Sequence, residues 1–151
     1  MDCAGNKVKL AGEVVQSFMS VSKTLVKFTQ QNASSLGLSI QQMGILNTIY
    51  AAPNITLKEI TEKLQLPKST VSSNVDDLFE AKLIERKTGE DDRREINLKL
   101  TAAGETLAKQ SCQNASSYKA MAAALNDFSE EEIQQLLRLH KALLSNLGKS
   151  L

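Results

Sequence analysis

Tryptophan is absent from this chain of 151 residues, and aromatic residues make up only 4% of it. Hydrophobic residues nevertheless reach 42%, so the core must come mainly from aliphatic side chains, which suit packing of helix on helix. This fraction also excludes wholesale disorder. The length fits one compact domain, or one domain with long helical extensions. We therefore expect a mostly helical globular protein.

Cysteine, histidine and long apolar runs are equally scarce. The two cysteines, Cys3 and Cys112, lie too far apart to form the disulfide framework of a small secreted protein. A single histidine, His140, excludes a metal site built from several histidines. No stretch approaches the roughly 18 apolar residues that a membrane helix needs. The first residues show no basic segment followed by an apolar run, as a signal peptide would. We expect a cytoplasmic protein with no membrane partner and no cofactor.

Both ends of the chain show long amphipathic helices. Residues 8–30 contain no proline and place apolar side chains at steps of three and four, which predicts one long helix. The polar residues 30–35 should end it. Two further helices are expected at residues 102–126 and 130–147, and the last carries a row of leucines. That row could pack within one subunit. Joining the first and last helices across a two-fold axis would bury both apolar faces, and this favours a homodimer.

Three helix starts carry the same local signature. In each, a serine or threonine is followed three residues later by glutamine or glutamate, and apolar residues flank the pair. Such a capping box satisfies two backbone N–H groups that the helix itself leaves without partners. The three pairs are Ser39 with Gln42, Thr56 with Glu59 and Ser129 with Glu132.

In the middle of the chain the hydrophobic period changes from helical to alternating. Ile96, Leu98 and Leu100 alternate with polar residues, as in a half-buried strand. Leu83–Lys87 is a plausible partner strand, and Thr88–Arg93 would form the loop between them. The pattern therefore predicts a two-stranded hairpin.

Two short helices, at about residues 56–64 and 67–82, precede this hairpin and are joined by Gln65-Leu66-Pro67. This order of elements is typical of a winged helix-turn-helix. One face of the second helix is apolar and would pack against the first helix. The other begins with hydroxyl side chains that can reach base edges and phosphates. An ordinary capped surface helix would show the same pattern. The apolar face holds Val71, Val75, Leu78 and Phe79, and the polar face begins with Ser69, Thr70 and Ser73.

The hairpin loop carries the stronger indication. Asp91-Asp92-Arg93-Arg94 places two arginines beside two aspartates at the tip of the hairpin or on its return strand. An arginine braced by a neighbouring carboxylate is preorganised to enter the narrow, strongly negative minor groove of DNA. The alternative is a solvated charged turn.

Two stretches resemble MarR-type transcriptional regulators. Residues 68–86, KSTVSSNVDDLFEAKLIER, are similar to the recognition-helix stretch of that family. Asp92-Arg93-Arg94 and the strand that leads into LTAAG at residues 100–104 resemble its wing and the start of the following helix. The element order agrees over nearly the whole chain, and the motif match covers about residues 56–104.

The resemblance implies a fold and an architecture. The fold is mostly α (α+β), a winged helix-turn-helix with long N- and C-terminal dimerisation helices and a two-stranded wing. It divides the chain into an N-terminal dimerisation helix at residues 1–35, a DNA-binding domain at residues 36–101 and C-terminal dimerisation helices at residues 102–151. The expected partners are a second copy of the chain and double-stranded DNA with an inverted-repeat operator.

The resemblance also implies roles for individual residues. Ser69, Thr70 and Ser73 would face the major groove, Arg94 would enter the minor groove, and Asp92 would brace Arg94. The sequence departs from the family at two positions, where Ser73 replaces a frequent basic residue and Lys82 replaces a frequent glycine. The full predicted DNA-binding set is Lys68, Ser69, Thr70, Ser73, Asn74, Arg86, Lys87, Asp92, Arg93 and Arg94.

Charge leaves a second class of function open. The net charge is only +1, and residues 58–99 hold nine basic and ten acidic side chains. Binding to DNA should therefore be modest and depend on a few cations. A winged-helix module that only dimerises or binds other proteins is the alternative. An enzyme is not expected, because we find no phosphate loop and no nucleophile motif.

Small side chains, the two cysteines and the histidine give three further expectations. Small residues at Ala115, Ser116, Ala120 and Ala123 could leave space for a small aromatic or lipophilic ligand that releases the protein from DNA. Cys112 and His140 should be packing residues of the core and of a helix seam. Cys3, ahead of the first helix, could be exposed to oxidants.

Overall fold

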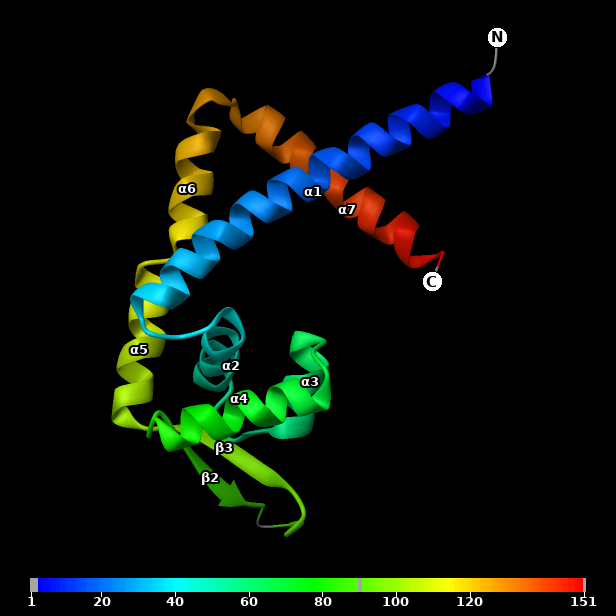
Figure 1. Ribbon diagram of the computed structural model, residues 1–151. Helices are drawn as coiled ribbons and strands as arrows, with labels where there is room; N and C mark the ends of the chain where they lie inside the picture. The colour runs from blue at the N-terminus through cyan, green and yellow to red at the C-terminus, as the bar shows by residue number, and fades with distance from the viewer. Residues whose placement is uncertain (1–2, 90, 151) are drawn as a thin grey trace. The chain divides into compact units, whose positions relative to one another are not determined.

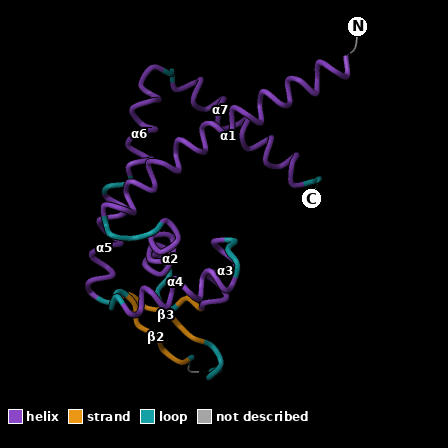
Figure 2. The backbone as a smooth tube through the Cα atoms, viewed as in Figure 1, coloured by secondary structure: helices purple, strands orange, loops and turns teal. Residues whose placement is uncertain are grey.

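The computed structural model describes residues 3–89 and 91–150, with side chains from Gly5 onward. Helices dominate, as expected (Figures 1 and 2). The chain divides into two compact units, residues 1–117 and 118–151. The elements are α1 (Cys3–Ser35), α2 (Ile40–Ala51), β1 (Ile55–Thr56), α3 (Leu57–Leu64), α4 (Lys68–Glu80), β2 (Ile84–Thr88), β3 (Ile96–Leu100), α5 (Ala102–Gln113), α6 (Ser116–Ala124), a 3₁₀ turn (Leu125–Asp127) and α7 (Glu130–Gly148).

All three predicted capping boxes are confirmed. The hydroxyls of Ser39, Thr56 and Ser129 each accept a hydrogen bond from the backbone N–H three residues on, and the side chain of that residue accepts one in return. These boxes begin α2, α3 and α7. Helix α4 starts differently, because Pro67 stands at its N-cap and gives no side-chain hydrogen bond. A proline suits a helix start because the N–H that it lacks would have no partner in the helix.

The sheet has three strands, so the expectation of a two-stranded wing was incomplete. Strand β3 lies in the centre and pairs antiparallel with β2 on one side and β1 on the other. The extra strand is only two residues long, with Ile55 opposite Leu98 and Thr56 opposite Asn97. Two residues give no alternation that could be recognised, and Thr56 also caps α3.

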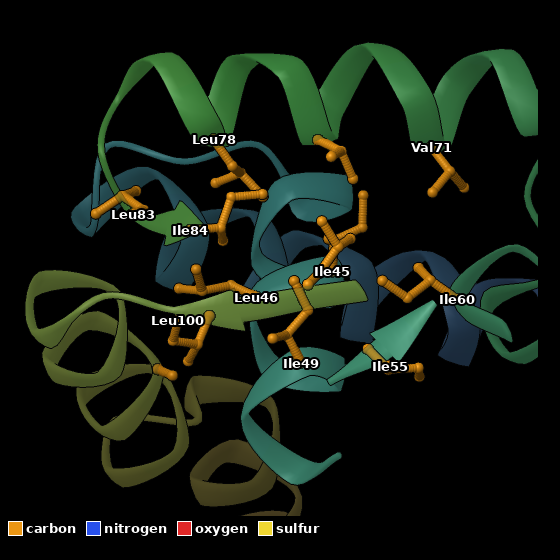
Figure 3. Packing of buried hydrophobic residues seen from close by; sticks show 13 residues of the cluster. Ile45, Leu46, Ile49, Ile55, Ile60, Val71, Leu78, Leu83, Ile84 and Leu100 are labelled. Carbon is orange, nitrogen blue, oxygen red and sulfur yellow. The ribbon is translucent and has the colours of Figure 1, made fainter. Parts of the chain in front are cut away.

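One hydrophobic core holds α2 to α5 and the sheet together (Figure 3). Each large aliphatic side chain that is fully buried contributes about 1.5–3 kcal/mol relative to its exposed state. Phe79, which was expected in this core, is 46% exposed instead. The fully buried large side chains are Ile45, Leu46, Ile49, Ile60, Val71, Val75, Leu78, Ile84 and Leu98.

Two helix boundaries differ from the expectation. Helix α1 continues through the polar residues 30–35 to Ser35, because Asn32 and Ala33 within that stretch are buried. The single helix expected over residues 102–126 is broken between Gln113 and Ser116 into α5 and α6. At that break the backbone carbonyl of Ser111 accepts a hydrogen bond from the amide of Asn32 at 3.1 Å. A helix carbonyl satisfied from outside does not need the next helical N–H.

Both terminal helices carry large apolar side chains that this single chain leaves exposed. Val8 and Val15 on α1, and Leu144 and Leu147 on α7, are among them. Cys112 is exposed on α5, so its expected place in the core was wrong. The side chain of Cys3 lies outside the described residues. In residues 3–89 and 91–150 no helix is both long and apolar enough to span a membrane.

Candidate nucleic-acid interface

Helices α3 and α4 form a helix-turn-helix. Helix α3 ends at Leu64, the C-cap residue Gln65 has a left-handed backbone at φ 51°, and Leu66 and Pro67 lead into α4. The reversal lets Ile60 of α3 and Val71 of α4 share the same core. Burial of one face of α4 therefore directs its opposite face toward solvent.

The exposed face of α4 begins with the predicted residues. Lys68, Ser69 and Ser73 are exposed, whereas Thr70 and Asn74 are half-buried. The Asn74 side-chain amide donates to the Thr70 carbonyl at 2.8 Å, one turn earlier in the helix. This donor is therefore engaged within α4, and the groups free to meet a ligand are the serine hydroxyls and the Lys68 ammonium.

The acidic residues at the far end of α4 are held by neighbouring elements. Asp76 forms an ion pair with Arg86 of β2. The Arg86 guanidinium also lies over the Phe79 ring, 4.7 Å from its centroid. The Gln42 amide donates to Asp77 at 3.4 Å. Arg86, predicted as a DNA contact, is thus directed to α4, and Phe79 is left outside the core as its stacking partner.

The wing consists of β2, β3 and the loop between them, and β2 packs against α4. The Gly89 N–H donates to the Glu95 carbonyl at 2.9 Å, and the Glu95 N–H to the Asp92 carbonyl at 3.0 Å. The Asp92 carboxylate accepts the backbone N–H of Arg94 at 2.9 Å. Asp92 therefore braces the backbone at Arg94, whereas the expectation was an aspartate beside the guanidinium.

The charged side chains of the wing divide between its faces. Arg93 and Arg94 are exposed, and within the described residues neither guanidinium forms an ion pair. Side chains alternate across a strand, so Lys87, opposite Asn97, lies on the sheet face away from Arg86, which is opposite Leu98. The predicted set is therefore brought together on α4 and at the wing loop, with Lys87 apart from both.

These exposed groups are suited to binding a polyanion rather than to catalysing a reaction. Exposed hydroxyls and a lysine begin α4, and the wing loop carries two exposed arginines that form no ion pair with any described residue. No group of three or more acidic, cysteine or histidine side chains in the described part of the chain could hold a metal ion. The ion pair between Arg86 and Asp76 was not predicted. The sequence shows only that the two residues carry opposite charges, which does not indicate that they meet.

Comparison with known proteins identifies the family. The model of the MarR family matches residues 36–95. The transcriptional regulator MgrA of Staphylococcus aureus is 30% identical over 102 residues, which cover 68% of this chain and 67% of MgrA. The chain therefore spans about two thirds of this relative.

Two solved structures extend the likeness along the chain. The multiple antibiotic-resistance repressor MarR of Listeria monocytogenes is 33% identical, with a TM-score of 0.64 and coverage of 93% of this chain and 96% of that one. A mutant of MepR from Staphylococcus aureus, bound to an oligodeoxyribonucleotide, is 27% identical with a TM-score of 0.58, and covers 89% of this chain and 97% of its own. The chain belongs to the MarR family of DNA-binding transcription regulators, which are not enzymes.

Proposed function

We propose that the protein is a homodimeric repressor that binds an inverted-repeat operator. Helix α4 would enter the major groove at each half-site, and Arg94 would reach the adjacent minor groove. The observation that carries this is that the wing loop presents two exposed arginines with no ion pair among the described residues, while α4 presents exposed hydroxyls and Lys68 at its start. The complex of the related MepR mutant with an oligodeoxyribonucleotide supports DNA as the ligand.

The exposed apolar rows of the terminal helices support the homodimer. Val15 of α1 is 56% exposed and Leu144 of α7 is 73% exposed, each with apolar neighbours on the same helix. Contiguous apolar surface of this kind marks a protein interface. A two-fold dimer joined through residues 1–35 and 102–151 would leave residues 36–101 to bind DNA. We expect this dimer to act in the cytoplasm.

The charge of α4 is less unfavourable to DNA than its sequence suggests. Asp76 and Asp77 would repel phosphates, but Arg86 neutralises the first and Gln42 donates a hydrogen bond to the second. We propose Arg86 as a residue that positions α4 against the wing. Direct contacts then fall to Lys68, Ser69, Thr70, Ser73, Arg93 and Arg94, with weaker contributions from Asn74 and Lys87.

Selection of bound fragments from random DNA tests the function. Recovery of an inverted repeat with half-sites about one helical turn apart is expected. Arg94→Ala should weaken binding to that operator by about 1–3 kcal/mol, the scale of one well-placed groove contact. Lys109→Ala, on α5, removes an exposed cation away from the interface and should change the affinity little. A wild-type protein that selects no sequence would favour the protein-interaction alternative.

The brace at Asp92 predicts a graded response. Asp92→Asn keeps an acceptor for the Arg94 N–H and should bind nearly as well as the wild type. Asp92→Ala loses that acceptor and should bind more weakly, although it removes a negative charge near DNA. Tighter binding by Asp92→Ala would show that simple electrostatics outweighs the brace.

Release by a small aromatic or lipophilic ligand remains a prediction. Ala115, Ser116 and Ala120 are half-buried and Ala123 is exposed, and these small side chains support it. A panel of aromatic acids, phenols and lipophilic cations should then raise the melting temperature and lower operator affinity. Close packing without a ligand site predicts no change in either quantity.

A further inference from the structure

Three polar residues from distant parts of the sequence meet in the interior of the first unit. Asn32 of α1 donates from its side-chain amide to the backbone carbonyl of Ser111 on α5, at 3.1 Å. Asn47 of α2 donates to the Ser111 hydroxyl at 2.8 Å. Asn32 is only 6% exposed and Ser111 only 2%. We call these three residues the polar joint.

The polar joint stabilises the core less than apolar side chains would. The side-chain carbonyl oxygens of Asn32 and Asn47 are buried and have no hydrogen-bond partner among the described residues. A buried polar group without a partner is destabilising, and apolar side chains of similar size usually pack there as well or better. Stability therefore does not account for amides at these positions. Hydrogen bonds differ from apolar contacts in being directional, so they can fix an orientation.

The polar joint lies where α1 is attached to the DNA-binding lobe, by which we mean the unit that α2 to α5 and the sheet form around the hydrophobic core. Asn32 and Ala33 in its last turn are the buried residues of α1 within its described part, and residues 5–24 are exposed. In Figure 1 the end of α1 lies beside α5, to which the Asn32 bond joins it, and α1 also contacts α2. The bond from Asn32 also caps the last turn of α5, whose Ser111 carbonyl has no helical N–H to accept from.

We propose that Asn32, Asn47 and Ser111 set the direction in which α1 leaves the lobe, and thereby the half-site spacing that the protein accepts. The proposal rests on the proposed function, a dimer joined through residues 1–35 and 102–151 on an inverted repeat. In such a dimer the angle at the root of α1 determines how far apart the two copies of α4 stand. Each added base pair turns one half-site by about a tenth of a helical turn, so a rigid joint penalises altered spacing.

Affinity for operators of different spacing tests the joint. The selected inverted repeat is compared with versions that have one base pair inserted or removed between the half-sites, using fluorescence anisotropy. Wild type should lose at least about tenfold in affinity on either change, the scale of one lost base-pair contact. Asn32→Leu keeps the number and branching of the heavy atoms in the side chain but loses both hydrogen-bonding groups, so the tenfold loss of affinity on altered spacing should shrink to about threefold or less. Gln31 is an exposed neighbour on α1, and Gln31→Leu should retain the wild-type ratio of the affinity for the selected operator to the affinity for the operators of altered spacing.

A second variant and a stability measurement exclude a merely structural effect. Asn47→Leu removes only the bond to the Ser111 hydroxyl and should relax the spacing preference in the same direction. Asn32→Leu leaves the buried Ser111 carbonyl without its partner and should lower the melting temperature, whereas both variants should remain folded dimers in sedimentation. If Asn32→Leu does not fold, Asn47→Leu decides. Folded dimeric variants that keep the wild-type spacing ratio overturn the proposal, whereas a wild type that binds no inverted repeat overturns the proposed function itself.

Discussion

Lys82 occupies a backbone position that suits glycine. Its φ is +58°, in the left-handed region, where the Cβ of an ordinary residue crowds the backbone. The conformation ends α4 and turns the chain into β2, with the Lys82 N–H bonded to the Phe79 carbonyl at 3.0 Å. The Lys82 carbonyl in turn accepts the Thr101 hydroxyl at 2.8 Å. The turn is therefore required, and lysine adopts it under strain.

Lys82→Gly should stabilise the protein. Relief of the left-handed strain exceeds the extra chain entropy of glycine, and we expect a gain of about 0.5–1 kcal/mol. Thermal or urea unfolding measures it. Lys63→Gly is the comparison, because Lys63 is also exposed but lies in the last turn of helix α3, where glycine should lower stability by up to about 1 kcal/mol. A loss of stability in Lys82→Gly would show that the lysine side chain has a packing role.

Glu59 makes one capping box sensitive to pH. Hydrogen bonds from the backbone N–H of Thr56, at 2.8 Å, and then from its hydroxyl, at 3.0 Å, lower the pKa of Glu59 from its ordinary value of 4.5. Lys63 lowers this pKa further. Because the pKa is lower in the folded state, ionised Glu59 stabilises the protein above about pH 4.5, and that contribution is lost as the pH falls through the folded-state pKa.

Glu59→Gln should remove this dependence. Glutamine can cap α3 as Gln42 caps α2, but without charge. The variant should melt below the wild type at pH 7, and the difference should narrow as the pH falls below 4.5. Unfolding curves at several pH values measure the difference. A gap that stays constant with pH would show that ionised Glu59 adds nothing beyond a neutral cap.

At the scale of elements, Arg86 links the wing to the recognition helix. Its strand places it on the face of the sheet that packs against α4, where it meets Asp76 and Phe79. The pair is substantially exposed, so it adds little to stability. Its effect is geometric, because it connects β2 to the trailing end of α4.

The salt dependence of DNA binding separates this role from a phosphate contact. Each phosphate contact adds about 0.9 to the slope of log affinity against log salt concentration. Arg86→Ala should weaken binding at every salt concentration and change that slope by much less than about 0.9, because only the repulsion from the released Asp76 carboxylate depends on salt. Arg94→Ala, the matched control, should lower the slope by about 0.9 if its guanidinium enters the groove. A reduced slope in Arg86→Ala would assign Arg86 to the DNA contact instead.

At the scale of the whole molecule, the terminal helices demand a partner surface. Val15→Glu or Leu144→Glu would place a charge in the apolar interface and should shift the protein from dimer to monomer at micromolar concentration. Operator affinity should then fall by about 10²-fold or more, because the two half-sites are no longer bound together. Lys23→Glu, at an exposed polar position on α1, should remain dimeric. Sedimentation velocity and anisotropy measure the two effects. A well-folded wild-type monomer would contradict the dimer.

The sequence alone determined those features whose causes lie within a few residues. Ser39, Thr56 and Ser129 begin helices because each meets its partner three residues away, and that spacing is visible in the sequence. Alternation at Ile96, Leu98 and Leu100 likewise specified a strand, and the resemblance of residues 68–104 specified the family. Such interactions are local, so they form wherever the same residues stand in the same order.

Tertiary structure decided what depends on residues far apart in the chain. Phe79 looked like a core residue from its helical spacing, yet it lies under Arg86, which reaches it from another element. The last turn of α1 and the last turn of α5 are joined by a bond between Asn32 and Ser111, 79 residues apart, which no local pattern could indicate. Helical periodicity records which side chains share a face. Which distant group meets that face is settled only when the elements pack, because the free energy of each contact depends on both partners.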